Sequence, residues 1–220
     1  MPKWSAPYIN KIETLILKDG KTSEARQVLE AATMNTGESL MDLRILLDIY
    51  DGKIKEALYE TDHSVPGDFD IEAGKYLTYA KIYNLLNNPY TAGVYYDSAL
   101  VMLNAVNMVE RSFLIHGCKA VAYAGKGNKE KAIEEGKLSI DLTFKNKTDE
   151  SDMKINQAEV YTMVGDYDNA IINIEYLMEN PSLFSVRKLE IDPVWRPLLK
   201  IAEVKTLIKK YSEEQKTETD

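Results

Sequence analysis

Apolar residues recur along this chain at the spacings of three and four residues that are typical of amphipathic helices, and the pattern itself repeats. The clearest unit reads Ala80-x2-Tyr83-x8-Ala92-x3-Tyr96-x2-Ala99. Its first half returns as Ala120-x2-Tyr123-x8-Ala132 and as Ala158-x2-Tyr161-x8-Ala170. Ala and Tyr three positions apart lie one turn apart on the same helix face, and the later Ala lets a second helix approach closely. Each unit is therefore predicted to be a helical hairpin.

A second marker lies at the turn inside the predicted hairpins. Gly stands five residues before Ala in four places, which are Gly20/Ala25, Gly52/Ala57, Gly127/Ala132 and Gly165/Ala170. Gly suits such a turn because it adopts the left-handed conformation that ends a helix. With Ala92 included, the anchor alanines are spaced by 32, 35, 40 and 38 residues. Hairpins of this kind bury their apolar stripes only by stacking, so the pattern predicts an all-α solenoid of about five hairpins.

The same periodicity gives a coarse map of the helices and no strand of useful length. Helices are expected near residues 6–18, 22–34, 38–50, 53–61, 70–87, 89–107, 109–125, 129–144, 151–164 and 167–179. Turns are expected at Asn35–Gly37 and at Val65–Asp68, where Gly, Pro, Asn and Asp gather. The fourth unit is stretched by Leu142–Asp149, which lengthens either its second helix or the loop after it.

After the fifth hairpin, the sequence predicts a C-terminal cap over residues 181–211. Pro193 and Pro197 flank Trp195 and break the helix, which leaves the indole to anchor a loop. A helix from about Pro197 to Tyr211 carries an apolar stripe that would cover the exposed face of the last hairpin. Residues 1–211 are thus expected to form a single domain, and the polar segment Ser212–Asp220 a disordered tail.

The Ala/Tyr/Gly pattern resembles the tetratricopeptide repeat (TPR). The match is fullest in the unit anchored at Ala92 and partial in the fourth and fifth units, where Gly136 and Ile174 replace the large aromatic residue of the second helix. It is weakest in the first two units, anchored at Ala25 and Ala57.

Longer stretches are similar to the C-terminal repeat arrays of bacterial signalling proteins, which follow adenylate/guanylate cyclase, serine/threonine kinase or winged-helix domains. The stretches that carry this similarity are Tyr50–Lys53, Ala122–Gly127, Val164–Tyr167, Pro181–Val186 and Ile191–Leu198. The resemblance implies a regulatory, non-catalytic module that binds a protein, a peptide or a neighbouring domain of its own protein. It also implies that the chain is an excised part of a longer protein.

Composition narrows the range of partners and compartments. Lys and Arg number 27 against 35 Asp and Glu, a formal net charge of −8. Without any basic block, this chain is expected to bind no nucleic acid. No apolar run reaches the roughly 18 residues that a membrane span needs. The first residues hold no signal-peptide core, which indicates a cytoplasmic location if Met1 is the true start.

No residue pattern predicts catalysis, a cofactor or a metal site. The two histidines, His63 and His116, are expected in an exposed loop and in helix packing, and Cys118 is expected to be a buried, inert thiol. The stretch Gly125–Lys129 lacks the spacing of a phosphate loop and follows a helix rather than a strand. Asp166 is expected to cap the helix that follows it.

The predicted binding surface is the concave face, formed by the first helix of each hairpin. The residues placed there by the register of the repeats are Leu77, Lys81, Asn84, Leu85, Leu114, Val121, Ile155, Glu159 and Thr162. This set lacks the Lys/Asn/Arg combination with which chaperone-binding members of the TPR family hold a terminal carboxylate, so a helix or extended segment is the expected ligand. Two alternatives stay open. One is a small-ligand sensor using His116 with Tyr79 or Tyr83, and the other is a homodimerisation domain.

Overall fold

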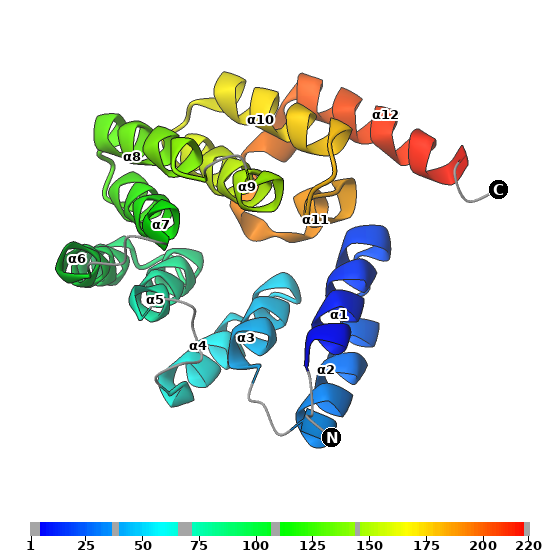
Figure 1. The fold of residues 1–220 in the computed structure, drawn as a ribbon, viewed down its shortest axis with the longest axis horizontal. Coiled ribbons are helices and arrows are strands. Elements are labelled where there is room, and N and C mark those ends of the chain that lie inside the picture. The colour runs from blue at the N-terminus through cyan, green and yellow to red at the C-terminus, as the bar shows by residue number, and fades with distance from the viewer. Residues whose placement is uncertain (1–4, 37–39, 66–71, 107–110, 144–145, 218–220) are drawn as a thin grey trace.

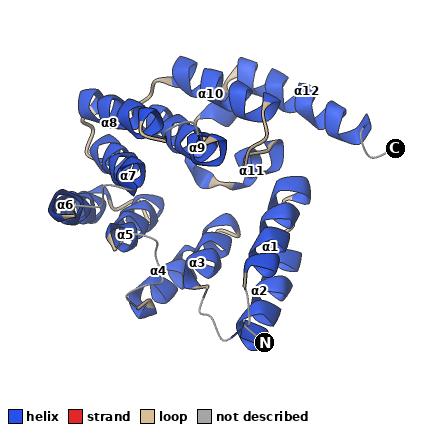
Figure 2. Cartoon of the chain, in the orientation of Figure 1, coloured by secondary structure: helices blue, strands red, loops and turns tan. Residues whose placement is uncertain are grey.

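A computed structural model describes residues 5–36, 40–65, 72–106, 111–143 and 146–217. Its described part is built from helices and loops (Figure 2). Ten of its helices form five antiparallel hairpins, each made of two helices that follow one another along the chain. The pairs are α1 (Ala6–Asp19) with α2 (Thr22–Thr36), α3 (Met41–Tyr50) with α4 (Ile54–His63), α5 (Ala73–Leu85) with α6 (Pro89–Ala105), α7 (Ser112–Gly125) with α8 (Lys129–Asp141), and α9 (Lys147–Met163) with α10 (Tyr167–Glu179). The fold is therefore the predicted all-α solenoid of five hairpins.

Every hairpin turn contains one residue in the left-handed conformation. Four are the predicted glycines, Gly20, Gly52, Gly127 and Gly165, with φ between 64° and 74°. The third hairpin uses Asn87 instead, with φ of 60°, and this residue also lies five positions before its anchor alanine. Asn adopts this conformation more readily than other non-glycine residues, so the same turn forms without Gly.

The anchor alanines lie in the core, as the repeat predicts. Ala25, Ala57, Ala92, Ala132 and Ala170 are each at most 1% exposed. Ala80, Ala120 and Ala158, one hairpin helix earlier, are fully buried. These small side chains mark where the helices of neighbouring units meet, and the larger apolar residues between them fill the space on either side.

The extra residues of the fourth unit extend a helix that was not expected to change. Helix α8 ends at Asp141, and α9 begins at Lys147 rather than near 151. The Asn146 side chain accepts hydrogen bonds from the backbone N–H groups of Thr148 and Asp149 and so caps α9 early. The prediction that the insertion lengthens α8 or the loop is thus wrong for α8. The predicted turn at Pro66–Asp68 and the helix starts near 38, 70 and 109 lie outside the described residues.

The C-terminal cap contains more elements than the predicted loop around Trp195 and the helix after it. It comprises α11 (Val186–Ile191), the 3-10 turns η2 (Pro193–Trp195) and η3 (Leu198–Lys200), and α12 (Ala202–Thr217). Proline rings and the buried Trp195 interrupt the chain before α12, which therefore starts later than Pro197. Helix α12 packs on α10 as a cap should, and it extends to Thr217, so the prediction of a disordered tail needs correction over 212–217.

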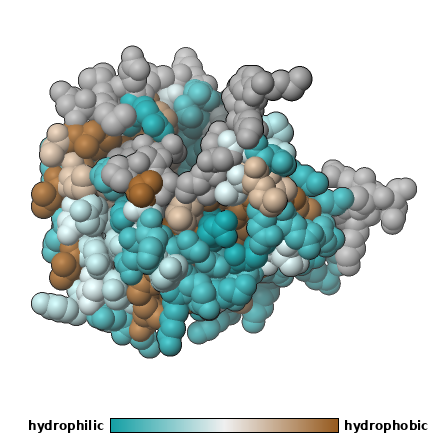
Figure 3. Space-filling view, turned by 90° about the horizontal axis from the view of Figure 1, so that it is seen from below, coloured by the Kyte–Doolittle hydropathy of each residue, from teal (hydrophilic) through white to brown (hydrophobic). Residues whose placement is uncertain are grey.

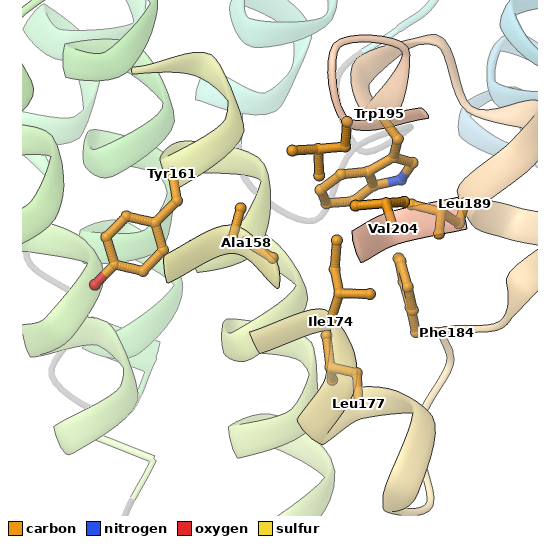
Figure 4. Close-up of a cluster of buried hydrophobic side chains, with 10 residues drawn as sticks. Ala158, Tyr161, Ile174, Leu177, Phe184, Leu189, Trp195 and Val204 are labelled. Carbon is orange, nitrogen blue, oxygen red and sulfur yellow. The ribbon is translucent and has the colours of Figure 1, made fainter. Parts of the chain in front are cut away.

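Trp195 anchors this cap in the largest apolar cluster. Its side chain is 1% exposed and meets Phe184 edge-on, with ring centroids 5.4 Å apart. Figure 4 shows the indole beside Leu189 and Val204, on the side of the cluster opposite Leu177. Residues from the last hairpin and from the cap thus share one core, which fixes the cap against α9 and α10.

The cap also reaches the first hairpin. Helix α11 contacts α1, and Ile191 packs on the cluster that holds Ile12 and Ile16 (Figure 1). The stack of hairpins therefore curves until its two ends meet, and α5, α7 and α9 face the inside of the curve. Within the described residues, no helix is both long and apolar enough to cross a membrane.

Candidate functional site

The concave side of the solenoid holds a cavity of about 500 Å³. Its walls come from α5, α7 and α9 on one side, and from Pro193, Val194 and Pro197 of the cap on the other. The cap turns inward and narrows the groove, and this second wall is not part of the concave surface that the repeat pattern predicted.

Seven of the nine predicted groove residues line this cavity. They are Leu77, Lys81, Asn84 and Leu85 on α5, Val121 on α7, and Glu159 and Thr162 on α9. Leu114 and Ile155 do not line it. Leu114 packs on the cluster of Ala99 and Leu103, and Ile155 packs on the cluster around Trp195. The repeat register therefore identifies helix faces that line the cavity, but it does not identify which of their residues are used in packing.

Lys81 and Asp192 form an ion pair at one end of the cavity. The distance from Lys81 Nζ to Asp192 Oδ1 is 3.5 Å. The same Asp192 oxygen accepts a hydrogen bond from the Val194 backbone N–H at 3.1 Å, so the carboxylate also caps η2. Burial alone would lower the pKa of Lys81, but Asp192 and Glu159 raise it above its ordinary value. Lys81 is therefore charged at neutral pH and ties the cap to α5.

Glu159 faces the same cavity without such a partner. In the described part of the chain it makes no hydrogen bond and no ion pair within 4 Å. Burial raises the pKa of its carboxyl group, the charge of Lys81 offsets this in part, and Asp192 adds to it. The site thus contains one carboxylate that makes no direct contact with a cation among the described residues.

Tyr96 completes the polar lining, although the sequence placed it in the core. Its hydroxyl accepts a hydrogen bond from the Asn84 side-chain amide at 3.0 Å, and burial raises its pKa. The ring fits against α7 only because residue 125 is Gly, since a Cβ there would lie 2.1 Å from the ring. Tyr96 is therefore fixed in place and presents its hydroxyl to the cavity.

A second group of charges lies where the cap meets α1, α3 and α9. Burial lowers the pKa of Lys188, whose ammonium donates to the Leu183 carbonyl at 3.0 Å. Burial raises the pKa of Glu13 and of Asp152, and both carboxylates interact with Lys188. Burial and the neighbouring Asp192 also raise the pKa of Tyr50. These charges extend the acidic character of the inner surface beyond the cavity.

The other residues considered for chemistry have separate partners. His116 Nδ1 lies 2.5 Å from Glu135, and the Tyr79 hydroxyl donates to Asp62. Tyr83 stacks with Tyr95, and His63 lies against Tyr59. The described residues contain no group of three or more His, Cys, Asp or Glu that could hold a metal ion. The described geometry thus does not combine His116 with either tyrosine in a small-ligand site.

Several cavity residues were not predicted from the sequence. Thr78, Met163 and Tyr167 lie on the predicted helices or next to them. Pro193, Val194 and Pro197 belong to the cap, as does Asp192, which lies beside the cavity and pairs with Lys81. The only signal for the second group was the motif Ile191–Leu198 itself. A motif can mark a segment as special, but it does not say which distant helix the segment contacts.

Helix α6 presents a second apolar surface on the outside of the solenoid. Tyr90, Val94 and Val101 are exposed there, and Asp97 is the one charged residue of the helix. In the view from below (Figure 3), apolar side chains gather toward the left edge, on the side where Figure 1 places α6, while the middle of that face is mostly hydrophilic. An exposed apolar surface is a feature that the homodimer alternative from the sequence would require.

No protein-family model matches the chain, and no curated protein matches it. Among solved structures, the chain is similar to a tetratricopeptide repeat protein from Parabacteroides merdae, with a TM-score of 0.40 and 16% sequence identity. The alignment covers 97% of this chain and 79% of that one.

Proposed function

We propose that the chain is a non-catalytic interaction module that binds a short segment of a protein partner in its concave cavity. The observation that supports this most directly is the composition of the cavity wall. Three successive hairpins and the cap contribute to it, and its side chains are mainly apolar with a few polar groups. Stacked hairpins commonly use their concave side in this way, and a few fixed polar groups orient a ligand.

The size of the cavity limits the ligand. An α-helix is about 10 Å across and rises about 5.4 Å per turn, so roughly one turn fills a volume of this size. The ligand of this proposal is therefore one turn of helix or a few extended residues, rather than a long helix lying along an open groove. The expected partner is a peptide motif in a flexible region or at a chain end.

A peptide-library selection against the full chain tests this function. The variant Thr78→Phe places a ring inside the cavity, and Ile172→Phe adds the same ring on the exposed surface of α10 as the control. Peptides that are enriched on the wild type and on Ile172→Phe, but lost on Thr78→Phe, would support the proposal. Enrichment that survives Thr78→Phe would place the binding site elsewhere and refute it.

A small-ligand sensor is the second candidate function. The inward turn of the cap favours it, because a cavity of about 500 Å³ falls in the range of small-molecule sites. A screen of metabolites by thermal shift separates the two functions. A metabolite that raises the melting temperature of the wild type and not of Thr78→Phe would favour the sensor, provided that the library yields no peptides.

The cellular setting belongs to the same proposal. The resemblance to bacterial signalling proteins suggests that the module regulates a catalytic or DNA-binding domain in the cytoplasm, and that this domain is its partner. A pull-down from source cells with the double variant Lys81→Glu/Asn84→Ala as control tests this setting. A partner that wild type and variant retain equally would argue against it.

A further inference from the structure

The charges in and beside the cavity do not balance, because Lys81 and Glu159 line it and the carboxylate of Asp192 lies beside Lys81. Lys81 forms its ion pair with Asp192, whereas Glu159 interacts with the same ammonium only at longer range and makes no ion pair within 4 Å among the described residues. Beyond the cavity, Lys188 faces two further carboxylates, Glu13 and Asp152. Among these six groups, two cations face four carboxylates, so the formal charge of the group is negative.

A half-buried carboxylate such as that of Glu159 is costly, because it has lost part of its water and has gained no hydrogen-bond donor. A ligand that brings a cation to Glu159 would remove this cost. A ligand that brings an anion would meet Glu159 directly, and Lys81 would have to release Asp192 to receive it. The geometry therefore favours a cation by two separate effects.

The rest of the wall suits an apolar stem that carries such a cation. Leu77 and Leu85 on α5 and Val121 on α7 line the cavity together with Met163. Long side chains such as Lys and Arg bury their methylene groups along surfaces of this kind while the charged end meets an acceptor. The hydroxyl of Tyr96 and the carbonyl of Asn84 add acceptors for the remaining N–H groups.

We infer that the cavity recognises a cationic group on an apolar stem, the side chain of a lysine or arginine in the partner segment, and that Glu159 is the residue that pairs with it. This inference rests on the proposed function and specifies its ligand. The same chemistry occurs in free alkylamines, so the test includes a peptide source and a free-amine source.

The experiment compares three probes by titration calorimetry and ligand-observed NMR on the full chain. The first is the peptide acetyl-Leu-Lys-Leu-amide, the second replaces its lysine with norleucine, and the third is n-pentylammonium. The proteins are the wild type, Glu159→Gln and Glu134→Gln. Glu134 lies exposed on the outer helix α8, so its substitution changes the net charge equally without touching the cavity. Thermal melts confirm that each variant is folded.

The lysine peptide is expected to bind wild type and Glu134→Gln at least about tenfold more tightly than the norleucine peptide, as for a hydrogen-bonded charge. In Glu159→Gln this difference is expected to vanish. Tighter binding of n-pentylammonium than of the lysine peptide would assign the site to a free amine.

Equal binding of the lysine and norleucine peptides to wild type would overturn the cationic ligand and leave the peptide-binding function intact. If Glu134→Gln loses the preference for the lysine peptide as Glu159→Gln does, the preference comes from the net charge of the protein. That result also would overturn the role of Glu159. If no probe binds at about 10 mM, where even a weak site is occupied, the cationic ligand is wrong. The library selection then decides separately whether the cavity binds peptides at all.

Discussion

Two clusters of charged side chains differ in how many of their carboxylates have an ion-pair partner within the protein. At the junction of the first two hairpins, the Arg26 guanidinium contacts Asp48 at 2.6 Å and Asp51 at 2.8 Å. In the concave cavity, Lys81 reaches Asp192 at 3.5 Å, and Glu159 has no partner within 4 Å in the described structure. Both clusters are sheltered from solvent, so the difference lies in the matching of donors and acceptors.

The carboxyl groups of the two clusters respond in opposite directions. Burial would raise the pKa of Asp51, but hydrogen bonds from Thr22, Arg26 and Lys53 hold it below its ordinary value. For Glu159, burial dominates and the pKa rises. A matched cluster stabilises the fold, whereas an unmatched one costs stability and suggests a binding role. The following predictions test this contrast.

The largest effect is expected from Arg26→Met at the matched cluster. The substitution keeps the apolar stem but leaves Asp48, which is 5% exposed, as a buried carboxylate without its cation. Breaking a buried pair from one side costs about 3 kcal/mol of unfolding free energy. Urea denaturation measures this loss. The control is Arg187→Met, because Arg187 pairs with Glu190 on the surface and its loss should cost no more than about 0.5 kcal/mol.

A smaller loss is expected from Gly125→Ala, which tests packing next to the unmatched cluster. The new Cβ would lie 2.1 Å from the Tyr96 ring, so the ring must move and release Asn84. Overpacking of this kind costs about 2 kcal/mol. The control is Gly93→Ala on α6, where a Cβ meets nothing within 4 Å and higher helix propensity should add about 0.5 kcal/mol. Equal effects of the two substitutions in thermal or urea unfolding would show that Tyr96 is not tightly held.

The repeat was readable from the sequence because local rules determine it. The anchor alanines and the glycine turns follow from helix geometry within one unit, so Ala132 and Gly127 were placed correctly without knowledge of the rest of the chain. The residue types of Asn87-Asn88-Pro89 also predict a turn, but the sequence does not show that Asn87 adopts the same left-handed conformation as the glycines. In the second unit, Asp48 occupies the place of the repeat tyrosine, which explains why that unit was hard to recognise.

Only one wall of the cavity could be predicted from the sequence, because the second wall comes from the C-terminal cap. The register of α5 and α9 identified Lys81 and Glu159, but nothing local indicates that Asp192 returns to meet Lys81. That contact depends on the summed curvature of five hairpins and on the packing of Ile191 against α1. Small rotations between neighbouring hairpins add up along a solenoid, so the contact between its two ends cannot be inferred from one repeat.

The smallest effect, and the one with the opposite sign, is expected from Glu159→Gln. The folded-state pKa of Glu159 is raised above its ordinary value of 4.5, because the folded chain favours the protonated carboxyl group. The stability that this preference contributes is fully present below pH 4.5 and is lost as the pH rises through the folded pKa. Glutamine has no charge to desolvate, so at neutral pH the variant should be more stable than wild type by about 1 kcal/mol. Urea midpoints measured between pH 3 and pH 7 check this, with Glu134→Gln as the control that should change little.

The pH profile of this gain separates the two clusters. The advantage of Glu159→Gln should disappear as the pH falls below 4.5, because the wild-type carboxyl is then protonated. Asp51 behaves in the opposite way: its pKa is lowered, so its contribution is present above its ordinary value of 3.8 and is lost only as the pH falls through a still lower folded value. The cost of Arg26→Met should therefore persist at pH 4 and shrink in stronger acid. If Glu159→Gln is less stable than wild type at neutral pH, Glu159 has a partner in the folded chain and the contrast between the clusters fails.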